Sequence, residues 1–431
     1  MTAVDVVQRK VLRVLAVTQV LGAAGVTIGL AVSTLIAAVL ADSDAVGGMA
    51  QTAAVVGAAV FALPGARLAA RSGRRPALVL GYGAGAVGAA VAACAVVLGS
   101  WQVLLLALVL FGAASSANLA ARYAGADLAH PHRRARSVAL VVWAATLGAV
   151  AGPNLADPAG RVAVRLGLPV GAGPYLLSVV LFGLAALVVL RFLKPDPLTL
   201  AKSAVTPATP VTPETPETPT TPTPPATSAT PVRGVGAKRS TAVWRSLPAA
   251  GRLALAGVTL CHTAMVGLMS MTPVHMEHSG ASLRVVGVVI SLHVAAMYAA
   301  SPLFGWMADR LGRVPVLAIG AALVVAASGI AGMAPSHDAP QLAAGLALLA
   351  FGWSAGVVAG SALLTESVGV VDRPAAQGLS DLCMNVGGAL GGVTAGIVVT
   401  AWSYAALGLV VGFTALPLLV TCLFASLQRV R

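Results

Sequence analysis

The stretch Gly305-Trp306-Met307-Ala308-Asp309-Arg310-Leu311-Gly312-Arg313 is a short basic segment between two long apolar runs. A similar stretch, Ala66-Arg67-Leu68-Ala69-Ala70-Arg71-Ser72-Gly73-Arg74, lies in the first half of the chain. The offset is constant, because Arg310, Gly312 and Arg313 each follow their counterpart by 239 residues. A segment that recurs at one offset in a hydrophobic chain indicates two homologous halves, as in many secondary transporters.

The composition is that of a membrane protein. Hydrophobic residues make up 58% of the 431 residues, charged residues 10%, and the mean hydropathy is +0.90. Soluble domains are about a quarter charged, so water is not the main solvent of this chain. About twelve apolar segments could each cross a hydrocarbon core of about 30 Å as a helix. They are predicted at residues 14–40, 46–66, 76–99, 102–123, 137–156, 173–193, 252–274, 284–306, 314–334, 340–365, 377–400 and 403–426.

Backbone groups in lipid must be hydrogen-bonded internally, and abundant Gly and Ala allow helices to approach closely. The sequence therefore predicts an all-α membrane protein with two pseudo-symmetric six-helix bundles. The predicted division is an N-terminal bundle at 1–198, a linker at 199–246 and a C-terminal bundle at 247–431. Most of the linker alternates Thr and Pro over residues 203–231, a composition that favours an extended or disordered segment.

The positions of the basic residues predict the orientation. With a cytoplasmic N-terminus, 24 of the 27 Lys and Arg residues fall on the cytoplasmic side, and the exceptions are Arg161, Arg165 and Arg284. This bias places both termini in the cytoplasm and explains the formal charge of +13 without a nucleic-acid partner. The first apolar run lacks a convincing cleavage site, so we expect a retained anchor in the cell membrane.

The nine residues from Gly305 resemble the signature loop of the major facilitator superfamily, and the twelve spans with a central linker resemble that fold over nearly the whole chain. In the first half the acidic position of the loop is Ala70, which leaves Arg71 and Arg74 without their usual partner. An Asp followed by Arg and a Gly turn at a helix end can pair with neighbouring helix ends and latch one conformation of a carrier. Such a latch is a gating element.

Two more acidic residues stand at equivalent helix ends. Asp127 follows the fourth span, and Glu366 lies 239 residues later. We expect them to complete the ionic network with the loop arginines; interfacial solvation of these charges is the alternative.

The fifth span carries Gly148 and Gly152-Pro153, which resemble a fragment of the antiporter motif of this superfamily. The resemblance implies export. Close helix packing at glycines and a bend at proline explain the same residues without it.

Methionine and histidine cluster in the seventh and eighth spans. Met265 and Met269 share one helical face, and His293 and Met297 share another. Thioether sulfur and imidazole favour Cu(I), and neutral ligands avoid the cost of a buried charge. Methionine at helical spacing is also typical of core packing.

These MxxxM and HxxxM patterns resemble the copper-site motifs of CcoA-like importers, which implies copper uptake and a metal site at Met265, Met269, His293 and Met297. Their first-half counterparts, Val26, Leu30, Ala54 and Ala58, are not ligands.

Other polar residues in the spans are candidates for substrate binding or coupling. His262 lies in the seventh span, and Asp381 and Asn385 lie one turn apart near the start of the eleventh. An acid within a membrane segment is a functional candidate, although a position near the helix end also suits a structural role.

We therefore expect a secondary transporter that works by alternating access and imports copper. The alternatives are a proton-coupled exporter of small amphipathic compounds, which uses His262 or Asp381, and a nontransporting receptor or assembly factor. No P-loop, nucleophile arrangement or carboxylate cluster suggests an enzyme. We expect no cofactor, nucleotide or nucleic acid, and a monomer in the lipid bilayer that binds a small solute or a metal ion.

Overall fold

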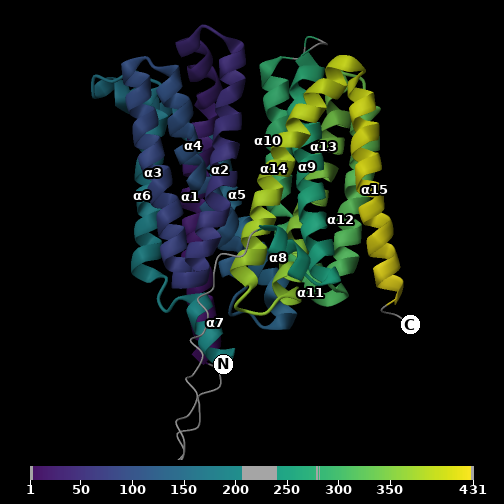
Figure 1. The fold of residues 1–431 in the computed structure, drawn as a ribbon. Coiled ribbons are helices and arrows are strands. Elements are labelled where there is room, and N and C mark those ends of the chain that lie inside the picture. Colours follow the sequence, from purple (N-terminus) through teal and green to yellow (C-terminus); the bar gives the residue numbers. More distant parts are fainter. Residues whose placement is uncertain (1–2, 206–239, 278–279, 281, 429–431) are drawn as a thin grey trace, which may run out of the picture.

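The structure is a computed structural model that describes residues 3–205, 240–277, 280 and 282–428. The described residues form a helical bundle without strands (Figure 1). Its helices are α1 (Ala3–Ala41), α2 (Asp44–Ser72), α3 (Arg74–Leu98), α4 (Trp101–Ala124), η1 (Pro131–Arg133), α5 (Arg134–Arg165), α6 (Ala172–Phe192), α7 (Pro197–Val205), α8 (Ser240–Ser246), α9 (Ala249–Glu277), α10 (Leu283–Ala299), α11 (Ser301–Leu311), α12 (Arg313–Gly332), α13 (Ala339–Ser367), α14 (Arg373–Ala401) and α15 (Tyr404–Gln428).

Twelve candidate membrane spans are present in the described part of the chain, and the predicted fold class is confirmed. The eighth span consists of α10 and α11, which meet where Pro302 occupies the first turn of α11. Several helices continue beyond the apolar segments that predicted them, for example α5, which was expected at 137–156. The extension of α5 packs against the start of α6, where a Cβ atom at Gly173 would lie 2.2 Å from the Ala159 carbonyl.

The spans of the first half and those of the second half form two groups that stand side by side (Figure 1). Each group has its own buried apolar core. Ala135, Val138 and Ala139 of α5 belong to the core of the second group, so the two cores meet along this helix. The parts of the predicted linker that the structure describes form the end of α7 and the short helix α8, whereas residues 206–239 lie outside the described residues.

Both described termini lie at one end of the bundle, which we call the terminal end (Figure 1). The two halves pack closely toward this end through α2 with α14 and α5 with α11. A Cβ atom added at Gly378 would lie 2.3 Å from the Ala66 side chain, and one added at Gly305 would lie 2.5 Å from Ala139. These two contacts are equivalent under the offset of 239 residues, so a pseudo-two-fold relation extends to the interface.

Candidate functional site

Two carboxylates at the terminal end, Asp127 and Glu366, each contact both halves. Asp127 accepts a hydrogen bond from Arg74 Nε at 2.7 Å, and the guanidinium of Arg373 from the second half lies 4.0 Å away. Arg74 also donates to the side-chain carbonyl of Gln377 in the second half. Asp127 therefore links an arginine of its own half to one of the other half.

Glu366 occupies the equivalent position in the second half. It accepts from Arg313 of its own half at 2.8 Å and lies 3.7 Å from Arg134 of the first half. The arrangement repeats that of Asp127, because Arg134 and Arg373 are also 239 residues apart. The side chain of Glu366 is 26% exposed, whereas that of Asp127 is fully buried.

Asp309 of the signature loop binds the start of a helix in the other half. Its carboxylate accepts hydrogen bonds from the backbone N–H groups of Ala135 and Arg136, both at 3.1 Å, in the first turn of α5. It also pairs with Arg313 at 3.0 Å. A carboxylate at a helix N-terminus satisfies free N–H groups and interacts favourably with the helix dipole.

The first half lacks this contact. Ala70 stands where the second half has Asp309, so the acceptor is absent. In the first turn of α14, Pro374 stands where α5 has Ala135, so one N–H donor is absent as well. Asp196, which follows α6, instead accepts from the backbone N–H of Arg75 at 2.7 Å, and Lys202 of α7 donates to the Ala70 carbonyl. The first-half loop is therefore held by its own half.

The remaining loop residues have separate roles. Gly73 and Gly312 have φ angles of +94° and +103°, a conformation that favours glycine at the turn between two spans. Arg71 and Arg310 are exposed, and Arg310 lies over the Trp306 ring rather than in the ionic network.

A buried ion pair joins the halves inside the spans. Arg122 of α4 donates to Asp381 of α14 at 2.7 Å, and both side chains are at most 5% exposed. Arg122 also donates to Ser361 at 3.0 Å, and Tyr123 donates to Ser380 at 3.1 Å. Separating these charges in a low-dielectric region is costly, so this pair stabilises the conformation in which the halves meet here.

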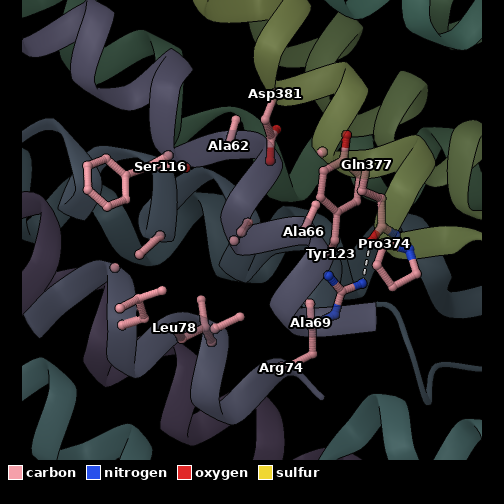
Figure 2. Close-up of a pocket in the computed structure, with 18 of the residues that line it drawn as sticks. Ala62, Ala66, Ala69, Arg74, Leu78, Ser116, Tyr123, Pro374, Gln377 and Asp381 are labelled. Carbon is pink, nitrogen blue, oxygen red and sulfur yellow. Dashed lines mark hydrogen bonds between the residues drawn. The ribbon is translucent and has the colours of Figure 1, made fainter. Parts of the chain in front are cut away.

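A small cavity of about 40 Å³ lies beside this pair between α2, α3, α4 and α14. Figure 2 shows Asp381 and Gln377 projecting from α14 toward it, with Arg74 opposite Gln377. Asn385 donates to the Asp381 backbone carbonyl one turn earlier at 2.7 Å, which places it on the same face of the helix.

Arg122 was not among the predicted site residues, because it was counted with the charges of the cytoplasmic loops. A signal was available: the arginine falls within the predicted span 102–123, and its offset partner Ser361 is polar as well. A charged residue within a span is a functional candidate.

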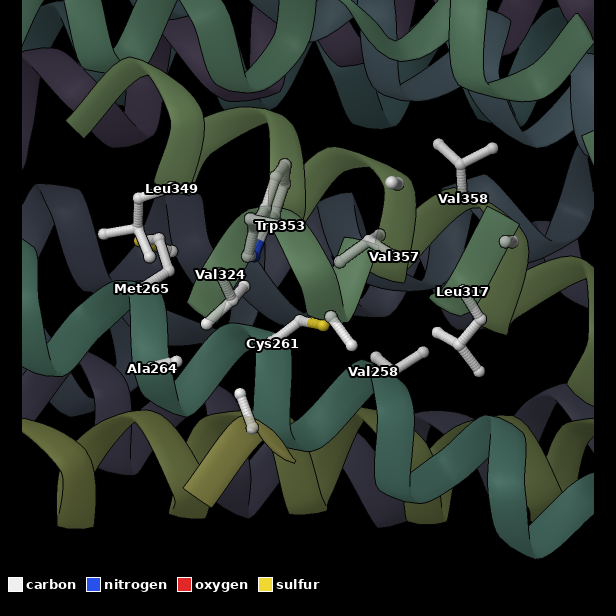
Figure 3. Close-up of a cluster of buried hydrophobic side chains, with 14 of the residues drawn as sticks. Val258, Cys261, Ala264, Met265, Leu317, Val324, Leu349, Trp353, Val357 and Val358 are labelled. Carbon is white, nitrogen blue, oxygen red and sulfur yellow. The ribbon is translucent and has the colours of Figure 1, made fainter. Parts of the chain in front are cut away.

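The predicted copper ligands occupy two helices that contact α13 more than each other. Met265 packs with Leu349 in a cluster of buried apolar side chains (Figure 3). His293 on α10 contacts the Leu346 carbonyl through Nδ1 at 2.7 Å, and its Nε2 is buried without a partner among the described residues. Met297 is buried and Met269 half-buried. In the described structure no contact brings all four residues together, because α9 and α10 each pack against α13 more extensively than against each other.

His262 lies in the middle of α9, where its Nδ1 accepts a hydrogen bond from the Trp353 indole at 3.0 Å. Its Nε2 lies against Gly388 of α14, one turn after Met384, which accepts a hydrogen bond from Arg122 of the first half. His262 therefore lies on the side of the second half that faces the first.

The glycines of the fifth span provide close packing. A Cβ at Gly148 would lie 2.2 Å from the Val20 carbonyl of α1, and one at Gly152 would lie 2.0 Å from the Thr27 hydroxyl. Pro153 is exposed within α5, which continues to Arg165.

Comparison with known proteins places this architecture in a family. The chain is 34% identical to the uncharacterized MFS-type transporter YdeG of Bacillus subtilis, over 95% of this chain and 90% of the relative. It is 25% identical to the riboflavin transporter RfnT of Brucella anthropi, over 87% of this chain and 85% of the relative. The human organic anion transporter MFSD10 has a similar fold, with a TM-score of 0.73, 17% identity and coverage of 96% of this chain and 99% of that one.

These relatives do not support the resemblance to CcoA-like copper importers or the antiporter assignment. The sequence matches the Major Facilitator Superfamily at residues 14–280 and 254–430. The chain belongs to the major facilitator superfamily and is a membrane transporter with twelve spans.

Proposed function

We propose that this secondary transporter moves a small solute by alternating access and that the Arg122–Asp381 pair couples the movement to protons. The single observation that supports this is the ion pair itself, which is buried within the spans and joins α4 of one half to α14 of the other. The halves cannot separate at the terminal end while both groups are charged and paired, because each would be left alone in a low-dielectric region.

Protonation of Asp381 is the step that permits separation. A neutral carboxyl no longer attracts Arg122, so rocking the halves apart no longer separates two opposite charges. The groups around Asp381 are Arg122 and Tyr123 of α4, with Arg74 of α3 as a further positive charge. Both arginines favour the charged carboxylate, and burial favours the neutral one.

The proposed orientation places the terminal end in the cytoplasm of the cell. The excess of Lys and Arg in the connections at this end supports it. The structure then represents the state closed toward the cytoplasm, and a proton that reaches Asp381 comes from outside.

The experiment uses spin labels at Ser72→Cys and Val371→Cys, which replace exposed residues of the two halves at the terminal end. Cys94 and Cys383 are replaced to remove competing labelling. In nanodiscs, the distance distribution is measured by pulsed electron paramagnetic resonance between pH 8 and pH 5. We expect a longer-distance population to grow as the pH falls, and Asp381→Asn to show it at every pH.

A distribution that is independent of pH in the wild type, and unchanged in Asp381→Asn, would contradict the proposal. That result is also expected of a receptor or assembly factor that kept the fold but does not alternate.

Riboflavin is the first solute to test in liposomes, because the relative RfnT is named for it. A proton gradient of either direction, applied across the liposome membrane, separates uptake from export.

A second candidate cargo is copper, and one observation favours it. With Nδ1 of His293 held by the Leu346 carbonyl, Nε2 is free to bind a soft ion, and Met297 lies one turn away. Competition for Cu(I) with a chromogenic chelator tests this directly. Loss of binding in both His293→Ala and Met297→Leu would support the site, and equal binding in wild type and variants would exclude it.

A further inference from the structure

Three ring side chains form a row across the face of the second half. His262 of α9, Trp353 of α13 and Tyr298 of α10 come from three neighbouring helices. The ring centroids of Trp353 and Tyr298 lie 5.6 Å apart in an edge-to-face arrangement, and those of Trp353 and His262 lie 6.4 Å apart. Trp353 is almost fully buried, whereas His262 and Tyr298 on either side of it are half-buried.

Polar atoms at both ends of this row are available to a ligand. Because His262 Nδ1 accepts the Trp353 hydrogen bond, the neutral imidazole carries its proton on Nε2. Neither that N–H nor the Tyr298 hydroxyl has a hydrogen-bond partner in the described residues, and neither atom is fully buried. Gly388 of α14 keeps the approach to Nε2 open, since a Cβ there would lie 3.0 Å from it.

The fold itself does not require these rings. The residues 239 positions earlier are Ala23, Ala114 and Ala59, so the first half has alanine at all three equivalent places. Aromatic residues are only 4% of the chain, which makes this concentration on one side of the interface a specific feature. The two halves therefore differ in side-chain chemistry at these equivalent positions, with rings in the second half and methyl groups in the first.

We propose that this row recognises a planar aromatic solute that carries hydrogen-bond acceptors, such as an aromatic carboxylate. The solute lies against the rings of His262 and Tyr298, and its acceptor receives the His262 Nε2 proton in a hydrogen bond. An ionised carboxylate makes the strongest hydrogen bond of this kind, and a planar ring packs well against the two side-chain rings. This inference names the substrate class of the proposed transporter and rests on the proposal that the space between the halves is the solute path.

The test compares two probes with the same carbon skeleton and carboxylate, 2-naphthoate, which is aromatic and planar, and decahydro-2-naphthoate, which is saturated and not planar. Binding to the full chain in nanodiscs is measured by isothermal titration calorimetry. We expect 2-naphthoate to bind about tenfold more tightly, as expected for favourable ring contacts beyond simple burial. Equal affinities, or no saturable binding of 2-naphthoate, would overturn the proposal.

The variants separate ring contact from hydrogen bonding. Tyr298→Leu removes a ring and is expected to lower the preference for the planar probe to about threefold or less, whereas Tyr298→Phe keeps it. His262→Phe keeps a ring but removes the donor, and is expected to weaken both probes by about tenfold. Trp402→Leu, at an exposed position directly after α14, is the matched control and should change neither affinity.

Thermal unfolding shows whether a variant is folded. If Tyr298→Leu or His262→Phe does not fold, the affinities for the two probes are compared in the conservative variants Tyr298→Phe and His262→Gln. An unchanged planar preference in every folded variant would also overturn the proposal. The spin-label measurement keeps the two proposals apart. If the pH-dependent distance change persists while the planar preference is absent, the alternating-access proposal stands and the substrate class is wrong.

Discussion

The two halves share a backbone plan but hold each other differently at the terminal end. The second half reaches across the interface, where Asp309 caps the first turn of α5 in the first half. The first half does not reciprocate, because Ala70 has no carboxylate and its loop is held by Asp196 and Lys202 on its own side. Pseudo-symmetry therefore preserves the scaffold and the paired carboxylates, whereas the capping contact between the halves is one-sided. Changes in the two halves should therefore have unequal effects.

The largest difference is expected between the two equivalent carboxylates. Asp127→Asn leaves Arg74 and Arg373 buried without a charged partner and should destabilise the protein by about 3 kcal/mol. Glu366→Gln should cost about 1 kcal/mol, because Glu366 is partly exposed and Arg313 keeps Asp309. Thermal unfolding in nanodiscs gives both values. Equal losses would show that burial does not distinguish the two halves here.

The next effect tests the one-sided contact directly. Asp309→Ala copies the first-half residue into the second half and removes both hydrogen bonds to the start of α5. We expect it to shift the conformational equilibrium by about 2 kcal/mol toward separation at the terminal end. The labels at positions 72 and 371 would report a longer-distance population. An unchanged distribution would mean that the capping contact does not hold the halves together.

A smaller contrast concerns close helix packing within each half. Gly148→Ala brings a methyl group against the Val20 carbonyl of α1 and should cost about 1–3 kcal/mol. At the equivalent Gly387 the nearest atom is the Thr263 hydroxyl, which can rotate away, so Gly387→Ala should cost under about 1 kcal/mol. Gly183→Ala is the control, since no atom lies within 4 Å of the added Cβ. A larger loss at Gly387 would reverse this ranking.

The smallest effect is expected when the missing acid is restored. Ala70→Asp should change thermal stability by less than about 0.5 kcal/mol, because the first turn of α14 contains Pro374, which has no N–H to donate. A gain of about 2 kcal/mol in thermal unfolding would show that an acid at this position can still cap the start of α14.

Much of the fold could be predicted because the lipid bilayer restricts which structures can cross it. Lipid requires long apolar helices, and twelve of them were visible in the hydropathy. The site was harder to predict, because its partners come from different helices. Asp381 was expected to act in coupling, but its partner Arg122 was overlooked among the loop charges, and nothing local in the sequence joins residues 259 positions apart.

The methionine pairs illustrate the opposite error. The spacing of each pair predicts that its two residues lie on one face of a helix. Spacing along one helix does not determine which neighbouring helix that face contacts. Met265 meets the apolar side chains of α13 instead of a facing His293.

The sequence by itself determined that the chain has two homologous halves, crosses a membrane in twelve helices and carries a basic, glycine-containing loop in each half. Hydropathy and a constant offset are properties of order along the chain, so they can be read without the fold. Only the tertiary structure decided that Arg122 pairs with Asp381, that Asp309 caps a helix of the other half, and that His262, Trp353 and Tyr298 form one row. These contacts depend on how the helices rotate and pack against each other, and that packing depends on all their side chains together.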